Sequence, residues 1–237
     1  PEMLSRQNGI TQTIVVFGST RIPEPAAARR ELEARRAACA AHPGDEECAR
    51  RVRIAGRILE KSRYYDVARQ FGQLVARADQ GRDGSHLVIL TGGGPGIMEA
   101  ANRGAFDVGA KSVGLNIKLP HEQFPNPYIT PDLCMRFHYF ALRKLHFLLR
   151  ARALVVFPGG YGTLDELFET LTLVQTRKIK PVPVVLGGEE YWRQVFNPDF
   201  LVDEGVIDPE DRELFWYAET AEEIWQGILH WYASTGL

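Results

Sequence analysis

An apolar segment leads into a glycine-rich loop in Ala153-Leu154-Val155-Val156-Phe157-Pro158-Gly159-Gly160-Tyr161-Gly162-Thr163. The same arrangement occurs earlier in the chain, in His86-Leu87-Val88-Ile89-Leu90-Thr91-Gly92-Gly93-Gly94-Pro95-Gly96. Continuous Val/Ile/Leu runs are typical of parallel strands that helices cover on both faces. A loop that leaves such a strand and begins a helix directs backbone N–H groups and the positive end of the helix dipole at one spot. Because glycine has no Cβ, a phosphate can approach this backbone closely. The two loops therefore indicate a nucleotide or sugar-phosphate site.

The composition is that of an ordinary folded protein. The chain has 237 residues, 45% of them hydrophobic and 24% charged, which suits one large α/β domain with a buried core. A formal net charge of −2 gives no general attraction to nucleic acid or to an anionic membrane. No apolar run approaches the roughly 20 residues that span a bilayer, and residues 1–6 lack the apolar core of a signal peptide. We therefore expect a cytoplasmic protein without membrane or nucleic-acid partners.

Apolar runs alternate along the chain with stretches that have helical periodicity. The predicted strands are 13–17, 86–90, 112–117, 133–137, 153–157, 182–186 and 214–218. This alternation predicts right-handed βαβ crossovers and a Rossmann-like, doubly wound parallel sheet. Ligands of such sheets bind outside the carboxyl ends of the strands, where both glycine loops fall. No repeat or low-complexity linker divides the chain, so a single nucleotide-binding domain is predicted over 1–237.

The segment between the first strand and its return helix is unusually long. Residues 25–79 are predicted to be helical with a break near 42–44, so that about 24–62 form an inserted helical hairpin. Its arginines are interleaved with acidic residues, which is typical of a solvated face, and contact with a partner is the minority interpretation. DNA binding through the insert is disfavoured for the same reason.

The three cysteines do not form a disulfide framework. Cys39 and Cys48 flank the predicted turn of the hairpin, where reduced thiols are favoured over a bridge. Cys134 lies in an apolar run and is predicted to be a small core residue. No cysteine or histidine spacing predicts zinc, and no metal is expected.

Neither glycine loop matches a dinucleotide fingerprint or a P-loop, which disfavours hydride transfer and ATP hydrolysis. Arg143 and Lys144 lie on the helix before the strand at 153–157. Neighbouring helix positions diverge by about 100°, so only one of the two can point squarely into the site. The planar fork of arginine suits a phosphate or a sugar hydroxyl.

Glu166 has two interpretations that the sequence leaves open. It lies one turn past Gly162 and can face the glycine loop. Together with Thr163 it also forms a Thr-x-x-Glu capping box, in which it would only satisfy the start of the helix. Asp165 and Glu169 are expected at the surface or in secondary contacts.

Residues 158–166 resemble the PGGxGTxxE signature of the LOG (Lonely Guy) family, Arg143-Lys144 resembles its Arg-Lys pair, and residues 92–100 resemble its first glycine loop. The resemblance extends from about Ile14 to Trp231 outside the insert. It implies a phosphoribohydrolase that needs no cofactor and cleaves the N-glycosidic bond of a nucleoside 5′-monophosphate, such as AMP or a cytokinin riboside monophosphate. The products would be the free base and ribose 5-phosphate. Residues 140–142 depart from the Met-His-x sequence that precedes the Arg-Lys pair in the simpler plant-like members, and residues 116–123 and 175–178 instead resemble the larger bacterial subgroup. No pyridoxal-phosphate site supports the older label of lysine decarboxylase.

The resemblance also implies roles for individual residues. Glu166 and Arg143 would be the catalytic pair. The substrate would be held by Gly18, Ser19, Gly92, Gly93, Gly94, Gly96, Lys144, Gly159, Gly160, Gly162 and Thr163. A homodimer or an assembly of dimers is expected, with the helix at 163–178 and the hairpin as contact surfaces. The alternative is a non-catalytic module that binds a nucleotide or a molybdenum cofactor through the same loops.

Overall fold

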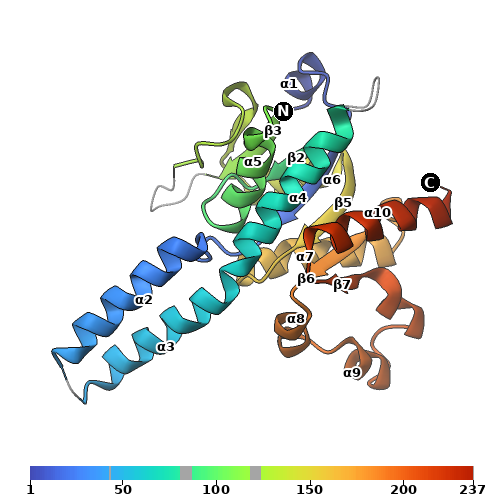
Figure 1. The fold of residues 1–237 in the computed structure, drawn as a ribbon. Helices are drawn as coiled ribbons and strands as arrows, with labels where there is room; N and C mark the ends of the chain where they lie inside the picture. The colour runs from blue at the N-terminus through green and yellow to red at the C-terminus, as the bar shows by residue number, and fades with distance from the viewer. Residues whose placement is uncertain (43, 81–86, 118–123, 237) are drawn as a thin grey trace.

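Seven parallel strands form one sheet in the part of the chain that the structure describes. The structure is a computed structural model and describes residues 1–42, 44–80, 87–117 and 124–236 (Figure 1). The strand order is β4-β3-β2-β1-β5-β6-β7. The strands are β1 (Gln12–Phe17), β2 (Leu87–Thr91), β3 (Ser112–Ile117), β4 (Cys134–Phe137), β5 (Ala151–Val156), β6 (Val184–Gly187) and β7 (Trp216–Ala218). Their order reverses on either side of β1, which confirms the predicted doubly wound α/β fold.

Helices cover both faces of the sheet. They are α1 (Glu2–Gln7), α2 (Pro25–Ala40), α3 (Glu46–Lys61), α4 (Arg63–Gln80), α5 (Ile97–Asp107), α6 (Phe140–Leu148), α7 (Tyr161–Gln175), α8 (Glu189–Val195), α9 (Pro198–Asp203) and α10 (Ala221–Thr235). Buried residues of α4, α5 and α10 form one core with the sheet, and those of α6, α7 and α8 form a second core on the opposite face.

Strand β1 shows why the apolar runs are continuous. Ile14 and Val16 lie in the first core, while Val15 and Phe17 lie in the second. Successive side chains of a strand point to opposite faces, so a strand buried on both faces needs apolar residues at every position.

The predicted elements agree with the structure apart from their ends. Strand β6 begins at Val184, two residues later than predicted, after Pro181 and Pro183, which have no N–H to donate to a ladder. Strand β7 begins at Trp216 because residues 209–214 form a 3₁₀ helix that starts with Pro209. The sequence pattern did not predict α1 or α9, and position 86 of the predicted second strand lies outside the described residues.

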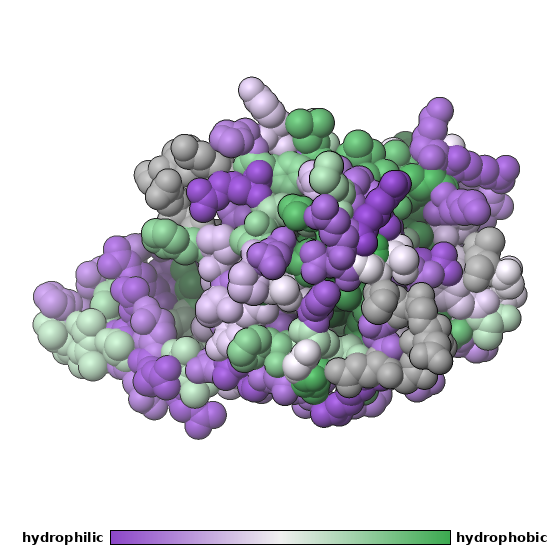
Figure 2. All heavy atoms as spheres, turned by 90° about the horizontal axis from the view of Figure 1, so that it is seen from above, coloured by the Kyte–Doolittle hydropathy of each residue, from purple (hydrophilic) through white to green (hydrophobic). Residues whose placement is uncertain are grey.

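Helices α2 and α3 form the predicted hairpin, which projects from the body of the molecule (Figure 1). Hydrophilic side chains interspersed with weakly hydrophobic ones cover this arm, at the left of Figure 2. Exposed ion pairs such as Arg35–Glu31, at 2.6 Å, fit the prediction of a solvated face. The cysteines near its turn are free thiols, and the Cys39 side chain beside Cys48 raises the pKa of the Cys48 thiol to about 11.

The described helices include none that is both long and apolar enough to cross a membrane. The described residues also contain no group of three or more acidic, histidine or cysteine side chains placed to hold a metal ion.

Candidate functional site

A cleft of about 610 Å³ lies at the carboxyl ends of the central strands. Its walls come from the loops after β1 and β2, the end of β3, and the N-terminal parts of α6 and α7. The predicted site residues that line it are Gly18, Ser19, Gly92, Gly94, Arg143, Gly160, Gly162 and Thr163. This volume lies within the range of small-molecule sites.

The first glycine loop is packed against the loop after β1. The N–H of Ile97, at the start of α5, donates to the Ser19 carbonyl at 3.2 Å. A Cβ on Gly96, which has φ +70°, would overlap this carbonyl, and a Cβ on Gly18 would lie 2.6 Å from Cγ2 of Ile97. Gly18 and Gly96 are therefore required for the close contact between the two loops, and the first N–H of α5 is taken by this contact.

The second glycine loop leaves the start of α7 open. Gly160 is the N-cap, without a side-chain cap, and the N–H groups of Tyr161 and Gly162 have no hydrogen-bond partner among the described residues. No atom lies within 4 Å of a Cβ built on Gly160 or Gly162. Free N–H groups at the positive end of a helix dipole form a site for an anion.

The capping interpretation of Glu166 is wrong. Helix α7 begins at Tyr161, so Thr163 is its third residue and cannot be the N-cap. Glu166 instead lies on the buried side of α7, with 4% of its surface exposed. Its Oε1 atom is buried without a hydrogen-bond partner among the described residues.

Glu166 and Arg143 form a loose, buried ion pair. Nη2 of Arg143 lies 3.6 Å from Oε1 of Glu166, which is longer than a hydrogen bond. Burial raises the pKa of Glu166 to about 7, although the positive charge of Arg143 opposes this shift. Nε of Arg143 is buried and also lacks a partner in the described structure. The unpartnered Nε donor of Arg143 and the unpartnered Oε1 acceptor of Glu166 can each accommodate a hydroxyl or a water molecule.

Arg143 connects this pair to the cleft. Its guanidinium lies over the rings of Phe140 and Phe147, with centroid distances of 5.2 and 5.3 Å. Nη1 lies 3.9 Å from the position of a Cβ on Gly92. Burial lowers the pKa of Arg143, and the charge of Glu166 opposes the change. The Arg143 side chain thus extends from Glu166 to the first glycine loop.

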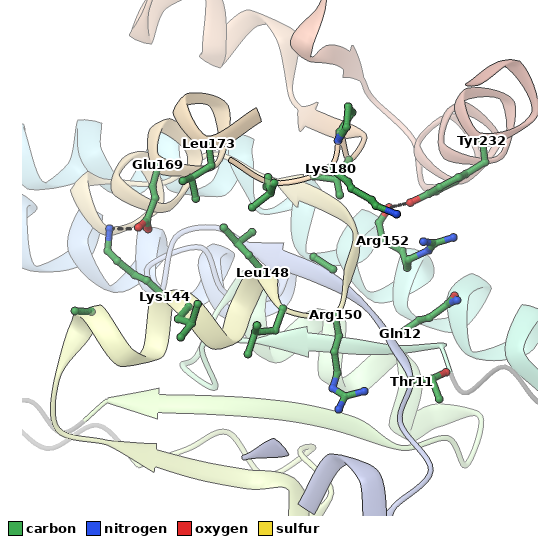
Figure 3. A pocket seen from close by; sticks show the side chains of 17 residues that line it. Thr11, Gln12, Lys144, Leu148, Arg150, Arg152, Glu169, Leu173, Lys180 and Tyr232 are labelled. Atoms are coloured by element: carbon green, nitrogen blue, oxygen red, sulfur yellow. Dashed lines mark hydrogen bonds and ion pairs between the residues drawn. The ribbon is translucent and has the colours of Figure 1, made fainter. Parts of the chain in front are cut away.

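Lys144 points elsewhere, as expected for neighbouring positions of a helix. Its Nζ atom pairs with Asp165 at 2.8 Å and with Glu169 at 3.0 Å. Figure 3 shows Lys144 facing Glu169 between α6 and α7, at the edge of a second hollow of about 750 Å³. Lys144 therefore does not line the cleft, and Asp165 and Glu169 hold it in place.

The remaining predicted residues are glycines that determine the conformation of the two loops. A Cβ on Gly159 would overlap the Thr163 side chain, and Gly93 has φ +74°, a left-handed conformation that suits glycine. Together with Gly96, these two glycines belong to the loops without lining the cleft.

The structure adds buried polar residues that the sequence did not single out for the site. Asn126 donates its N–H to the Gly93 carbonyl at 2.9 Å and its Nδ2 to the Gly94 carbonyl at 3.2 Å. Its Nδ2 also donates to Oδ1 of Asn102 at 3.0 Å. Asn116, noted in the sequence as a subgroup residue, lines the cleft at the end of β3. Ile117, a second subgroup residue, lines it as well, whereas the subgroup residues at 119–123 lie outside the described residues.

Comparison with known proteins agrees with these motifs. A family model described as "Possible lysine decarboxylase" matches residues 98–228. The cytokinin riboside 5′-monophosphate phosphoribohydrolases LOG3 and LOG1 of Arabidopsis thaliana are 31% and 30% identical over 171 residues, which cover 70% and 69% of this chain and 74% of each relative. The chain belongs to the LOG family.

Solved structures share the fold of this LOG-family chain. A structure titled TM1055 is 21% identical, with a TM-score of 0.53, and the alignment covers 92% of this chain and 99% of that one. The Moco carrier protein of Chlamydomonas reinhardtii is 18% identical, with a TM-score of 0.50 and coverage of 94% and 99%. At these identities the likeness extends to the fold alone.

Proposed function

We propose that this protein hydrolyses the N-glycosidic bond of nucleoside 5′-monophosphates, releasing the free base and ribose 5-phosphate. The names of the relatives suggest cytokinin riboside monophosphates as substrates, and the family resemblance of the sequence adds AMP. The observation that carries the proposal is a buried Arg143–Glu166 pair, with unpartnered polar atoms, beside an open helix N-terminus.

The open start of α7 suits the 5′-phosphate. The N–H groups of Tyr161 and Gly162 would donate to phosphate oxygens, and the helix dipole would stabilise their charge. At the start of α5 the Ile97 N–H already donates to Ser19, and the first turn carries the negative charge of Glu99, whereas the first turn of α7 has no acidic residue. We therefore assign the phosphate to the second loop and the rest of the nucleotide to the first. Anchoring the phosphate supplies binding energy that positions the reacting bond.

The Arg143–Glu166 pair suits the chemistry at the ribose. Departure of the base builds positive charge on the sugar, which a nearby carboxylate stabilises. Water then adds to C1′ and loses a proton, while the base leaves with one. A carboxyl group with a pKa of about 7 can exchange a proton near neutral pH. Arg143, which keeps its charge, would hold a sugar hydroxyl or the departing base through its fork of donors.

The non-catalytic alternative would need Glu166 only for structure. A capping role would supply such a need, but Glu166 does not cap α7. A buried carboxylate with an unpartnered oxygen costs stability, and such costs are typical of groups kept for chemistry.

The test is incubation of the purified protein with AMP, followed by chromatography for adenine and ribose 5-phosphate. We expect release by the wild type and by Glu190→Gln, which changes an exposed carboxylate on α8, and none by Glu166→Gln. Stabilisation of Glu166→Gln by AMP, measured as a rise in melting temperature, would show that binding survives. Binding without release by the wild type would instead establish a binding module, and turnover by Glu166→Gln would remove Glu166 from the mechanism.

We also propose that the protein forms a homodimer through α6 and α7. This face exposes Leu142, Leu145, Leu149 and Phe168, and it borders the apolar hollow of Figure 3. An exposed apolar face of this kind can be buried against the same face of a second copy across a two-fold axis. Light scattering should give a dimer mass for the wild type and a lower mass for Leu145→Glu. A stable wild-type monomer at micromolar concentration would refute the dimer.

A further inference from the structure

A carboxamide without a partner lies at the far end of the cleft. Asn116 is 6% exposed, and the residues of β3 around it are all buried. Its side chain lines the cleft, yet it makes no hydrogen bond within the described part of the chain. Neither amide atom is among the fully buried polar atoms that lack a partner in the described chain, so the amide group opens to the cleft while the rest of the residue is buried. An amide that is held in a buried strand and has both hydrogen-bonding atoms free toward a cleft is available to pair with a ligand.

The backbone keeps this amide accessible. Nδ2 of Asn116 lies 3.6 Å from the position that a Cβ on Gly93 would occupy. The glycine therefore leaves space beside the amide on the side of the first loop. The Asn126 hydrogen bonds to the carbonyls of Gly93 and Gly94 hold this loop in place.

The sheet order fixes the distance of Asn116 from the phosphate site. Strand β5 leads into α7, and β3 lies three strand intervals away, across β1 and β2. At about 4.8 Å per interval, the ends of β5 and β3 are roughly 14 Å apart. Arg143 spans the region between, from Glu166 on α7 to Gly92 at the end of β2. A nucleotide with its phosphate on α7 and its sugar beside Arg143 therefore directs its base toward Asn116.

We propose that Asn116 recognises a 6-aminopurine base, an inference that rests on the proposed function. Oδ1 of Asn116 accepts a hydrogen bond from the 6-amino group, and Nδ2 donates one to N7. Asparagine pairs with adenine in this bidentate way, and such a pair discriminates between bases by roughly 5- to 150-fold. A 6-oxopurine offers two acceptors on the same edge and cannot satisfy both atoms of the amide. The base specificity of the enzyme is thus set at the end of β3.

The experiment compares AMP with IMP, which carries an oxygen in place of the 6-amino group. We expect the kcat/KM of the wild type to be roughly 5- to 150-fold higher for AMP than for IMP. In Asn116→Leu this AMP-to-IMP ratio should fall close to one, because the activity toward AMP is lost. The melting temperature of unliganded Asn116→Leu should not fall, because leucine suits this buried strand. Ser112→Ala, at the other end of β3, is the control and should keep the wild-type ratio. Asn116→Ser, whose shorter side chain cannot span two base atoms, serves if the leucine variant does not fold.

Binding measurements separate this inference from the proposed hydrolysis. In a Glu166→Gln background, calorimetry should show tighter binding of AMP than of IMP, and Asn116→Leu should remove the difference. If calorimetry shows this difference but neither the wild type nor any variant releases a base, then Asn116 recognises the base and the proposed hydrolysis is wrong. If AMP is hydrolysed but its advantage over IMP is absent or persists in Asn116→Leu, Asn116 does not read the base.

Discussion

In a Glu166→Gln variant the protein should become more stable at alkaline pH while losing the release of free base. Glu166 has an ordinary pKa of 4.5 when unfolded, and burial raises this value to about 7 in the folded protein. Between these two values the folded state holds a proton that the unfolded state has released. Stability therefore falls as the pH rises through this range. Glutamine resembles the protonated carboxyl group and carries no such cost.

The size of the effect follows from the shift in pKa. Each pKa unit corresponds to about 1.4 kcal/mol, so the full cost of ionising Glu166 in the folded protein is about 3 kcal/mol above pH 7. At pH 5 most of the folded protein is still protonated, and the difference from the glutamine variant is about 1 kcal/mol. The advantage of Glu166→Gln in free energy of unfolding should therefore grow by about 2 kcal/mol between pH 5 and pH 8.

Urea denaturation at the two pH values measures this difference, with the fluorescence of the four tryptophans as the signal. Glu190→Gln is the matched control, since Glu190 is exposed and has no ion pair among the described residues. Its stability should follow that of the wild type at both pH values. A Glu166→Gln advantage that does not change with pH, or a wild type that is the more stable protein at pH 8, would refute the assignment of a raised pKa to Glu166.

Three further substitutions test the site and its supporting loops. Arg143→Lys keeps the charge but loses the planar fork, and kcat/KM for AMP should fall by roughly 100-fold or more; near-normal activity would remove the need for arginine. Gly96→Ala should unfold at a lower temperature, with a loss of about 1–3 kcal/mol in stability, because its φ is +70° and a Cβ meets the Ser19 carbonyl. An unchanged melting temperature would contradict the close contact of these loops. Asn126→Ala leaves the Gly94 carbonyl without its donor and should cost about 1–3 kcal/mol in urea denaturation, whereas a neutral result would mean that the first loop does not need this bond.

The strands could be predicted because burial on both faces leaves a simple signal. Residues 112–117 match β3 without a shift, and the first strand differs by one residue. The inserted hairpin could be predicted from the length of the helical segment between two elements of the sheet. The divergence of Arg143 and Lys144 followed from helix geometry alone.

The state of Glu166 could not be decided from the sequence. Thr-x-x-Glu fits both a capping box and the interior of a helix, and the start of α7 two residues earlier decides between them. The hydrogen bond from Asn126 to the Gly94 carbonyl joins residues 32 positions apart, so no local sequence pattern predicts it. The free amide of Asn116 at the cleft is likewise a property of the folded neighbourhood, because only packing determines which side chains an amide can reach.

The peptide of Ser19 has a consequence for exchanging parts of this protein with its relatives. Its N–H donates to the Pro158 carbonyl at 2.9 Å, and its carbonyl accepts from the Ile97 N–H, so one residue is bonded to both glycine loops. A chimera that takes only one of these loops from a relative would disturb the register of the other two. The three loops at 18–21, 92–97 and 158–163 should therefore be grafted together, as a single inherited unit.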